Sequence, residues 1–155
     1  MANLTTNSPN VNATNPTAYI QLPVAGGVHI YESSAVCVDT NGNAQLAADT
    51  ANYIYLGNSL QESDNSASLS TPPNVNVEQL CPLTNAMSTV TVLAGNATQA
   101  LVGQLVYWVD DNNVAVNGSS TNKVTAGRVN QYLSATTVII NRFDRWSATG
   151  ISAVR

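Results

Sequence analysis

Charged residues are scarce in this chain. Only 9% of its 155 residues are Asp, Glu, Lys or Arg, and it has one histidine. A typical soluble domain has about 25% charged residues, so amide and hydroxyl side chains must supply most of the surface polarity. Five basic residues against nine acidic ones give a net charge of −4. Nucleic-acid binding needs a basic patch, so we predict no nucleic-acid partner.

Long apolar runs are also missing. No stretch approaches the roughly 18 apolar residues that a membrane-crossing helix needs, so we predict no membrane partner. The start, Met1-Ala2-Asn3-Leu4, has neither the basic nor the apolar region of a secretion signal. We therefore expect a chain made in the cytoplasm, where Cys37 and Cys81 would be reduced, buried thiols; a disulfide between them is the alternative.

No combination of residues is typical of an active site. His29 lies in the alternating segment Val28-His29-Ile30, which predicts a solvent-facing strand position and not a metal ligand. Asp39, Asn41 and Asn43 match the start of a calcium loop, but the glycine and glutamate that complete such a loop are missing. A hairpin turn explains the same residues. We predict a protein that is not an enzyme and that uses no cofactor or metal.

Short alternating segments separated by turn residues dominate the sequence. The expected strands are 18–22, 28–32, 34–38, 52–57, 75–81, 88–94, 105–109, 114–116, 123–129 and 136–141. This spacing predicts an all-β fold, either a small β-barrel or a β-sandwich of short antiparallel strands. The best helix candidate, 44–51, has no clear cap and no apolar face.

Segments of different composition flank and interrupt the expected β-domain, which spans 17–141. Residues 1–16 are Asn-rich and nearly without apolar side chains, which predicts an extended arm. That arm is either a loose terminus or a segment that orders against a neighbouring subunit. The Ser-rich stretch 58–73 predicts a long surface loop. Residues 142–155 mix aromatics with arginines and predict a docking tail.

Partner contacts are expected in these outlying segments. The candidates are Asn10, Val11 and Asn12 in the arm, Ser63 and Asp64 in the loop, and Arg142, Phe143, Arg145 and Trp146 in the tail. Tyr53 and Tyr55 share one strand face and could form an exposed aromatic stripe that binds glycans. Packing in the core is the simpler interpretation of that stripe, and it is also favoured for Trp108.

A faint internal repeat links the two halves of the chain. The segment Ala35–Asn41 resembles Leu105–Asn112, and each is followed by a strand that ends near a glycine, Gly57 or Gly127. Two similar β units that pack together would explain this pattern. Independent strand–turn segments of similar composition would explain it equally well.

Residues 100–114 and 123–129 carry a family resemblance. The first stretch has a glycine, an apolar pair, Val-Tyr, Asp and a turn, and the second has a lysine followed by Gly-Arg-Val. Together they resemble the capsid cement, or head decoration, proteins of tailed phages. The upstream portion up to the strand 52–57 also fits, so the resemblance covers about residues 24–141. The arm, the Ser-rich loop and the tail lie outside the family pattern.

The resemblance implies a small β-barrel-like domain on the outer surface of an expanded phage head. There it would form a homotrimer that bridges subunits of the major capsid protein and stabilises their lattice. The protein would be made in the host cytoplasm and end in the virion. The alternative is a phage fibre or adhesion domain that binds host-surface glycans. A small β-fold hydrolase is the least supported hypothesis.

Overall fold

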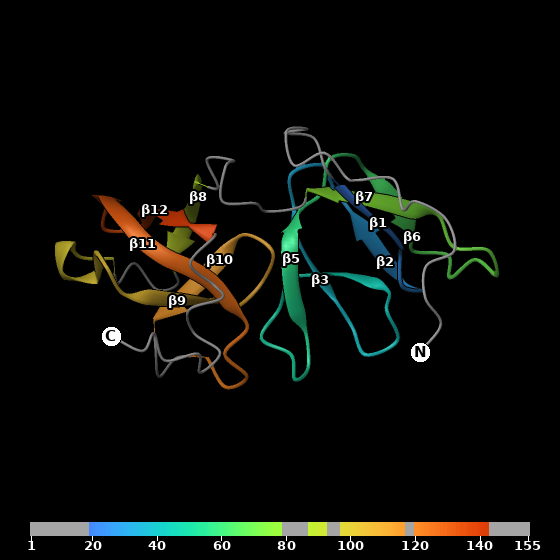
Figure 1. Ribbon diagram of the computed structural model, residues 1–155, viewed down its shortest axis with the longest axis horizontal. Coiled ribbons are helices and arrows are strands. Elements are labelled where there is room, and N and C mark those ends of the chain that lie inside the picture. Colours follow the sequence, from blue (N-terminus) through green and yellow to red (C-terminus); the bar gives the residue numbers. More distant parts are fainter. Residues whose placement is uncertain (1–18, 79–86, 93–96, 117–119, 143–155) are drawn as a thin grey trace, which may run out of the picture.

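A computed structural model describes residues 19–78, 87–92, 97–116 and 120–142. These residues form strands joined by turns, which confirms the predicted all-β fold. Two groups of strands lie side by side, one from each half of the chain (Figure 1). Within the described ranges, no helix is long and apolar enough to cross a membrane.

The strands of the second half close into a barrel. They are β8 (Met87–Val92), β9 (Leu105–Trp108), β10 (Asn113–Val116), β11 (Thr125–Ser134) and β12 (Thr137–Asn141), preceded at β9 by the 3-10 turn η2 (Gln99–Leu101). Their order around the barrel is β10-β8-β12-β11-β9. Neighbouring strands are antiparallel except β8 and β10, which are parallel. We call this unit the second barrel.

The strands of the first half form three small sheets. They are β1 (Tyr19–Pro23), β2 (Val28–Ile30), β3 (Ala35–Val38), β4 (Ala44–Leu46), β5 (Ile54–Asn58), β6 (Ser63–Asn65) and β7 (Asn74–Glu78). The pairings are β1 with β7, β2 with β6, and β3 with both β4 and β5. Single bridges from Val24 to Ala44 and from Ser59 to Val77 join the sheets. The resulting order β4-β1-β7-β5-β3 matches that of the second barrel, so we call this unit the first barrel.

The two barrels repeat one structure, with an offset of 70 residues between their central strands. Val36 pairs with Gly57 in the first barrel, and Val106 pairs with Gly127 in the second. In both sheets the register shifts by one residue next to that glycine. The faint sequence repeat is therefore a repeat of structure, and β1, β3, β4, β5 and β7 correspond to β8, β9, β10, β11 and β12.

Equivalent hairpin turns close the β3–β4 and β9–β10 pairs. In the first, Asp39 Oδ1 accepts the backbone N–H of Asn41 at 2.8 Å and of Asn43 at 2.9 Å. In the second, Asp110 Oδ1 accepts the backbone N–H groups of Asn112 at 2.9 Å and of Asn113 at 2.8 Å. Burial alone would raise the pKa of Asp39, but these hydrogen bonds hold it below its ordinary value. The hairpin predicted at this turn is confirmed.

Matching positions fill the interiors of both barrels. The first interior contains Val24, Val36, Ala44, Val75 and Val77, and the corresponding residues of the second are Val92, Val106, Val114, Val138 and Ile140. All are almost fully buried. Because alternate residues of a strand point to the same side, the alternation in the sequence places these side chains inside. Each buried side chain of this size contributes about 1.5–3 kcal/mol of transfer free energy.

Two expected features differ in the structure. The long loop predicted over 58–73 contains a strand, β6, which pairs with β2. The weak helix candidate 44–51 begins as strand β4, because the Ala44 side chain is fully buried inside the first barrel. Pairing with the distant strand β2 forms β6, and burial of Ala44 favours a strand at β4; both override local composition.

We predict that Gly57→Ala and Gly127→Ala both destabilise the protein strongly. A Cβ at Gly57 would collide with the backbone carbonyl oxygen of Glu78, and one at Gly127 with that of Asn141. Backbone atoms in a sheet cannot move aside, so each substitution should cost at least about 2–3 kcal/mol. Urea unfolding followed by circular dichroism measures this cost.

Gly26→Ala is the matched control for these substitutions. Its Cβ would meet the Ser68 hydroxyl at 3.1 Å, which is the mobile end of a side chain. We expect a cost below about 1 kcal/mol for this control. Equal stability of all three variants would contradict the close strand approach at the two glycines.

Candidate functional site

The two barrels meet through a different face of each. The first barrel contributes the outward side of its β3–β4–β5 sheet, from which Ala35, Cys37, Ala47 and Tyr55 join the core cluster of the second barrel. The second barrel contributes the end that carries the β9–β10 turn and residues 120–124. We call that end the loop end of a barrel, and we call the outward sheet side the receiving face. In Figure 1 the β9–β10 turn extends toward β5.

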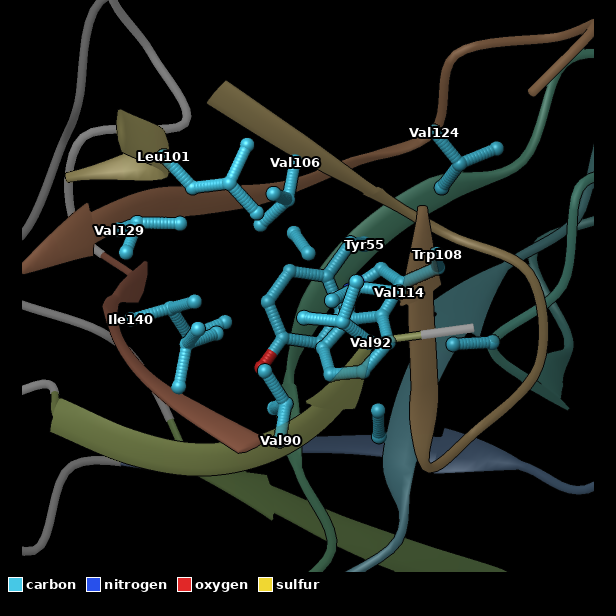
Figure 2. Packing of buried hydrophobic residues seen from close by; sticks show 14 of the residues in the cluster. Tyr55, Val90, Val92, Leu101, Val106, Trp108, Val114, Val124, Val129 and Ile140 are labelled. Carbon is cyan, nitrogen blue, oxygen red and sulfur yellow. The ribbon is translucent and has the colours of Figure 1, made fainter. Parts of the chain in front are cut away.

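Tyr55 fills the centre of this contact. Its ring lies among residues of the second barrel, next to Trp108, Val92 and Val114 (Figure 2). The ring centroids of Tyr55 and Trp108 are 5.2 Å apart and tilted by 59°, a favourable geometry for an aromatic pair. The Tyr55 hydroxyl donates to Asn58 Oδ1 at 2.8 Å, so the polar end of the side chain is also satisfied.

Burial of Tyr55 decides between the two interpretations of the aromatic stripe. Only 3% of Tyr55 and 2% of Trp108 are exposed, so the core interpretation is confirmed for both. Tyr53 is partly buried against the same cluster. The glycan-binding alternative therefore loses the stripe that motivated it.

Asp49 holds the rim of the contact. Its carboxylate accepts the backbone N–H groups of Thr121 and Asn122, both at 2.7 Å, and the Ser120 hydroxyl at 3.0 Å. The Asn122 side-chain amide donates to the Asp49 carbonyl oxygen at 2.6 Å. Burial would raise the pKa of Asp49, but these hydrogen bonds stabilise the carboxylate and lower its pKa.

Sequence reasoning missed Asp49. The residue lies in an Ala-rich stretch, and its partners are more than 70 residues away along the chain. No local motif marks a carboxylate that caps a remote loop. Asp49 could have been found only by placing the two halves of the repeat against one another.

A partly buried ion pair joins the end of β12 to the end of β7. Arg142 is 5% exposed, and its Nη2 lies 3.1 Å from Glu78 Oε2. Burial by itself lowers the pKa of Arg142, but Tyr55 and Glu78 outweigh it and raise the pKa above its ordinary value. Arg142 was expected in the docking tail, whereas the structure places it inside the fold with a partner of its own chain.

The remaining expected contact residues fall into two groups. Ser63 is buried, and its hydroxyl donates to the Asn74 carbonyl at 3.1 Å. Asp64 is exposed, and its carboxylate accepts the Ser66 N–H at 2.8 Å. The other expected contact residues lie outside the described residues: Asn10, Val11, Asn12, Phe143, Arg145 and Trp146. Contacts through them, and through Asp64, stay predictions.

His29 lies on the outer surface of β2 and is partly exposed. Its Nε2 is 2.7 Å from Glu62 Oε1, and its ring stacks on Tyr31 with centroids 4.2 Å apart. This agrees with the expected solvent-facing strand position. Across the described ranges, no group of three or more His, Cys, Asp or Glu residues could hold a metal ion.

Large apolar side chains are exposed on both barrels. They are Tyr19, Tyr31, Ile54, Leu60, Leu69, Val102 and Leu133. Exposed apolar residues on a chain with so few charges offer surface for protein contacts. Comparison with protein-family models, curated proteins and solved structures finds no match to this chain.

We predict that Tyr55→Ala destabilises the chain by about 3–5 kcal/mol, because it leaves a cavity between the barrels. Tyr19→Ala is the matched control, because Tyr19 is 55% exposed; its effect should stay within about 0.5 kcal/mol. Thermal and urea unfolding measure both. Equal effects would contradict the central position of Tyr55.

We also predict that Asp49→Asn destabilises the chain at neutral pH by about 1–3 kcal/mol, because charge-assisted hydrogen bonds are lost. The folded pKa of Asp49 is lowered. The contribution of Asp49 is therefore present above its unfolded pKa and disappears as the pH falls through the lower, folded value. Unfolding curves of wild type and variant should differ at pH 7 and converge in acid.

Asp111→Asn serves as the control for the Asp49 variant. Asp111 contacts the first barrel through its backbone carbonyl, which accepts the Ala35 N–H at 3.4 Å. Substitution of its side chain leaves that bond in place. A difference between wild type and Asp49→Asn that does not depend on pH would rule out the carboxylate as its source.

Proposed function

We propose that this protein is a structural head decoration protein that binds the outer surface of a phage capsid and stabilises the lattice of the major capsid protein. It acts through surface contact and not through catalysis. The proposed assembly is a homotrimer on the virion. The sequence resemblance motivates this proposal, and three features of the described residues support it.

The first supporting feature is where the resemblance falls. The upstream stretch that fits the family pattern ends at Gly57 and belongs to the first barrel, while 100–114 and 123–129 belong to the second. The one family pattern, over about residues 24–141, therefore spans both barrels. A small β-barrel-like domain is what the resemblance implies.

The contact between the barrels is the observation that carries the proposal. Here the loop end of a barrel binds the sheet face of another with an aromatic centre, small apolar neighbours such as Ala35 and Ala47, and a hydrogen-bonded rim at Asp49. An apolar centre with a polar rim is the usual composition of protein–protein interfaces. A decoration protein needs this kind of surface toward the shell.

The third supporting feature is the combination of low charge with exposed apolar side chains. Removing water from charged groups costs free energy when a partner docks. Because only 9% of the residues are charged, this cost is small here. Side chains such as Leu60 and Leu69 are about half exposed. They would add apolar area to such a contact.

One surface feature favours glycan binding as the second candidate function. Tyr31 is 59% exposed and stacks on His29, with the Glu62 carboxylate at the ring edge. Sugars stack on aromatic rings, and carboxylates accept hydrogen bonds from their hydroxyls. Specific binding on a glycan array that Tyr31→Ala abolishes would favour this candidate.

The proposed function predicts selective binding to mature shells. Purified protein should cosediment with expanded phage heads that lack decoration protein, and should bind unexpanded heads at least 10-fold more weakly. Bound heads should resist a higher temperature before releasing their DNA. Protein that ignores expanded heads over a panel of tailed phages would overturn the proposal.

The state of the free protein is measured in the same samples. Analytical ultracentrifugation of the full chain should give a trimer, and the same measurement is made on a chain without residues 1–16. A truncated chain that no longer forms trimers would assign the arm to subunit contacts. A full chain that stays monomeric at high concentration would contradict the trimer.

A further inference from the structure

The repeat points to a binding role for the loop end of the first barrel, which is exposed to solvent. In the second barrel the loop end is covered, and Val124 there is only 4% exposed. The corresponding residue of the first barrel is Ile54, which is 59% exposed. In Figure 1 the β3–β4 turn, at the same end of the first barrel, lies at its lower edge, away from the second barrel.

The loop beside Ile54 has the same donors as its counterpart. Residues 50–52 read Thr-Ala-Asn, and residues 120–122 read Ser-Thr-Asn, so both provide a hydroxyl, backbone N–H groups and a side-chain amide in the same order. The 70-residue offset holds on both sides of the loop, which therefore has equal length in the two barrels. Thr50, Ala51 and Asn52 are all exposed.

The loop end of the second barrel, which is covered, shows what a loop end binds in this chain. Residues 120–122 hold the Asp49 carboxylate through two backbone N–H groups and a hydroxyl. The same face of the first barrel contributes the small residues Ala35 and Ala47, together with Tyr55, to the apolar centre of the contact. The ligand of a loop end in this chain is thus a sheet face with small apolar side chains and a carboxylate at its rim.

We propose that the loop end of the first barrel, formed by Val38, Thr50–Asn52 and Ile54, docks on a partner protein with that chemistry. The partner presents a sheet face with small apolar residues and an Asp or Glu side chain at its edge. This inference rests on the proposed function, and it makes the partner a subunit of the capsid shell. Ile54 packs on the apolar patch, and the loop donors bind the carboxylate.

A second copy of this chain fits the surface less well. On the second barrel, Tyr107 occupies the position on the receiving face that Cys37 occupies on the first barrel. Only 8% of Tyr107 is exposed. Seventy residues after Asp49 the sequence has a serine, which carries no carboxylate. The receiving face of the first barrel is occupied by the second barrel of the same chain.

The test compares the affinity of two surface variants for expanded heads. Ile54→Asp places a charge in the proposed apolar contact and next to the partner's carboxylate, so it should weaken binding at least 10-fold. Asn52→Ala removes the side-chain donor and should weaken binding about 3-fold to 10-fold. Quantitative cosedimentation over a range of protein concentrations gives each dissociation constant.

Leu133→Asp is the matched control. Leu133 is 46% exposed, on β11 of the second barrel, and its variant should bind as wild type does. Melting curves establish that each variant is folded. Ile54→Ser, a smaller perturbation, replaces Ile54→Asp if the aspartate variant melts early, and it should still weaken binding about 3-fold or more because apolar area is lost.

The outcomes separate the docking inference from the proposed function. Wild type that binds no heads refutes the proposed function. Wild type that binds heads, together with Ile54 variants that bind equally well, overturns the docking inference and leaves the proposed function standing. Loss of the oligomer in free Ile54→Asp, seen by analytical ultracentrifugation, makes a second copy the occupant and also overturns the inference. A head-binding defect confined to Ile54 and Asn52 variants supports it.

Discussion

The insertion of Tyr55 into the second barrel is the contact on which the arrangement of this chain depends. Tyr55 belongs to β5 of the first barrel, yet it packs on Trp108 and is almost fully buried. Its removal would open the second barrel's core and also release the receiving face of the first. Asp49 adds a directional constraint at the rim, since its carboxylate fits only one position against residues 120–122. The apolar centre supplies most of the affinity between the barrels, and the hydrogen bonds fix their orientation.

The structural repeat also explains which corresponding positions of the two barrels are alike and which differ. Interior positions remain apolar in both copies, with Val36 matched by Val106 and Val77 by Ile140. Surface positions differ where their surroundings differ. Val124 is covered by a neighbouring barrel and Ile54 is not, although both occupy the same place in the fold. One barrel end thus serves an internal contact, and its copy is left for a partner, which is the basis of the docking proposal.

Many strand positions along the chain were accessible from alternation and turn residues, because side-chain period and turn chemistry act locally. The hairpin at Asp39 and the core position of Trp108 belong to this group. Strand β6 was not accessible, since Ser63, Asp64 and Asn65 have weak strand preference and are held by pairing with β2. Arg142 was expected in a docking tail for a similar reason: composition describes a residue's neighbours in sequence and not Glu78, its partner across the fold.

The amino-acid sequence by itself determined the all-β class and the positions of most turns, and it left the similarity of the two halves as one of two explanations. Those properties follow from periodicity, glycine and asparagine placement and a low charge content, all of which act within a few residues. Only the tertiary structure decided that the halves are two barrels of the same strand order and that they meet through unlike faces. It also decided that Asp49 and Tyr55 belong to that contact while Ile54 stays exposed. These outcomes depend on pairing and burial between residues tens of positions apart, where free energy is gained only when the whole surface comes together.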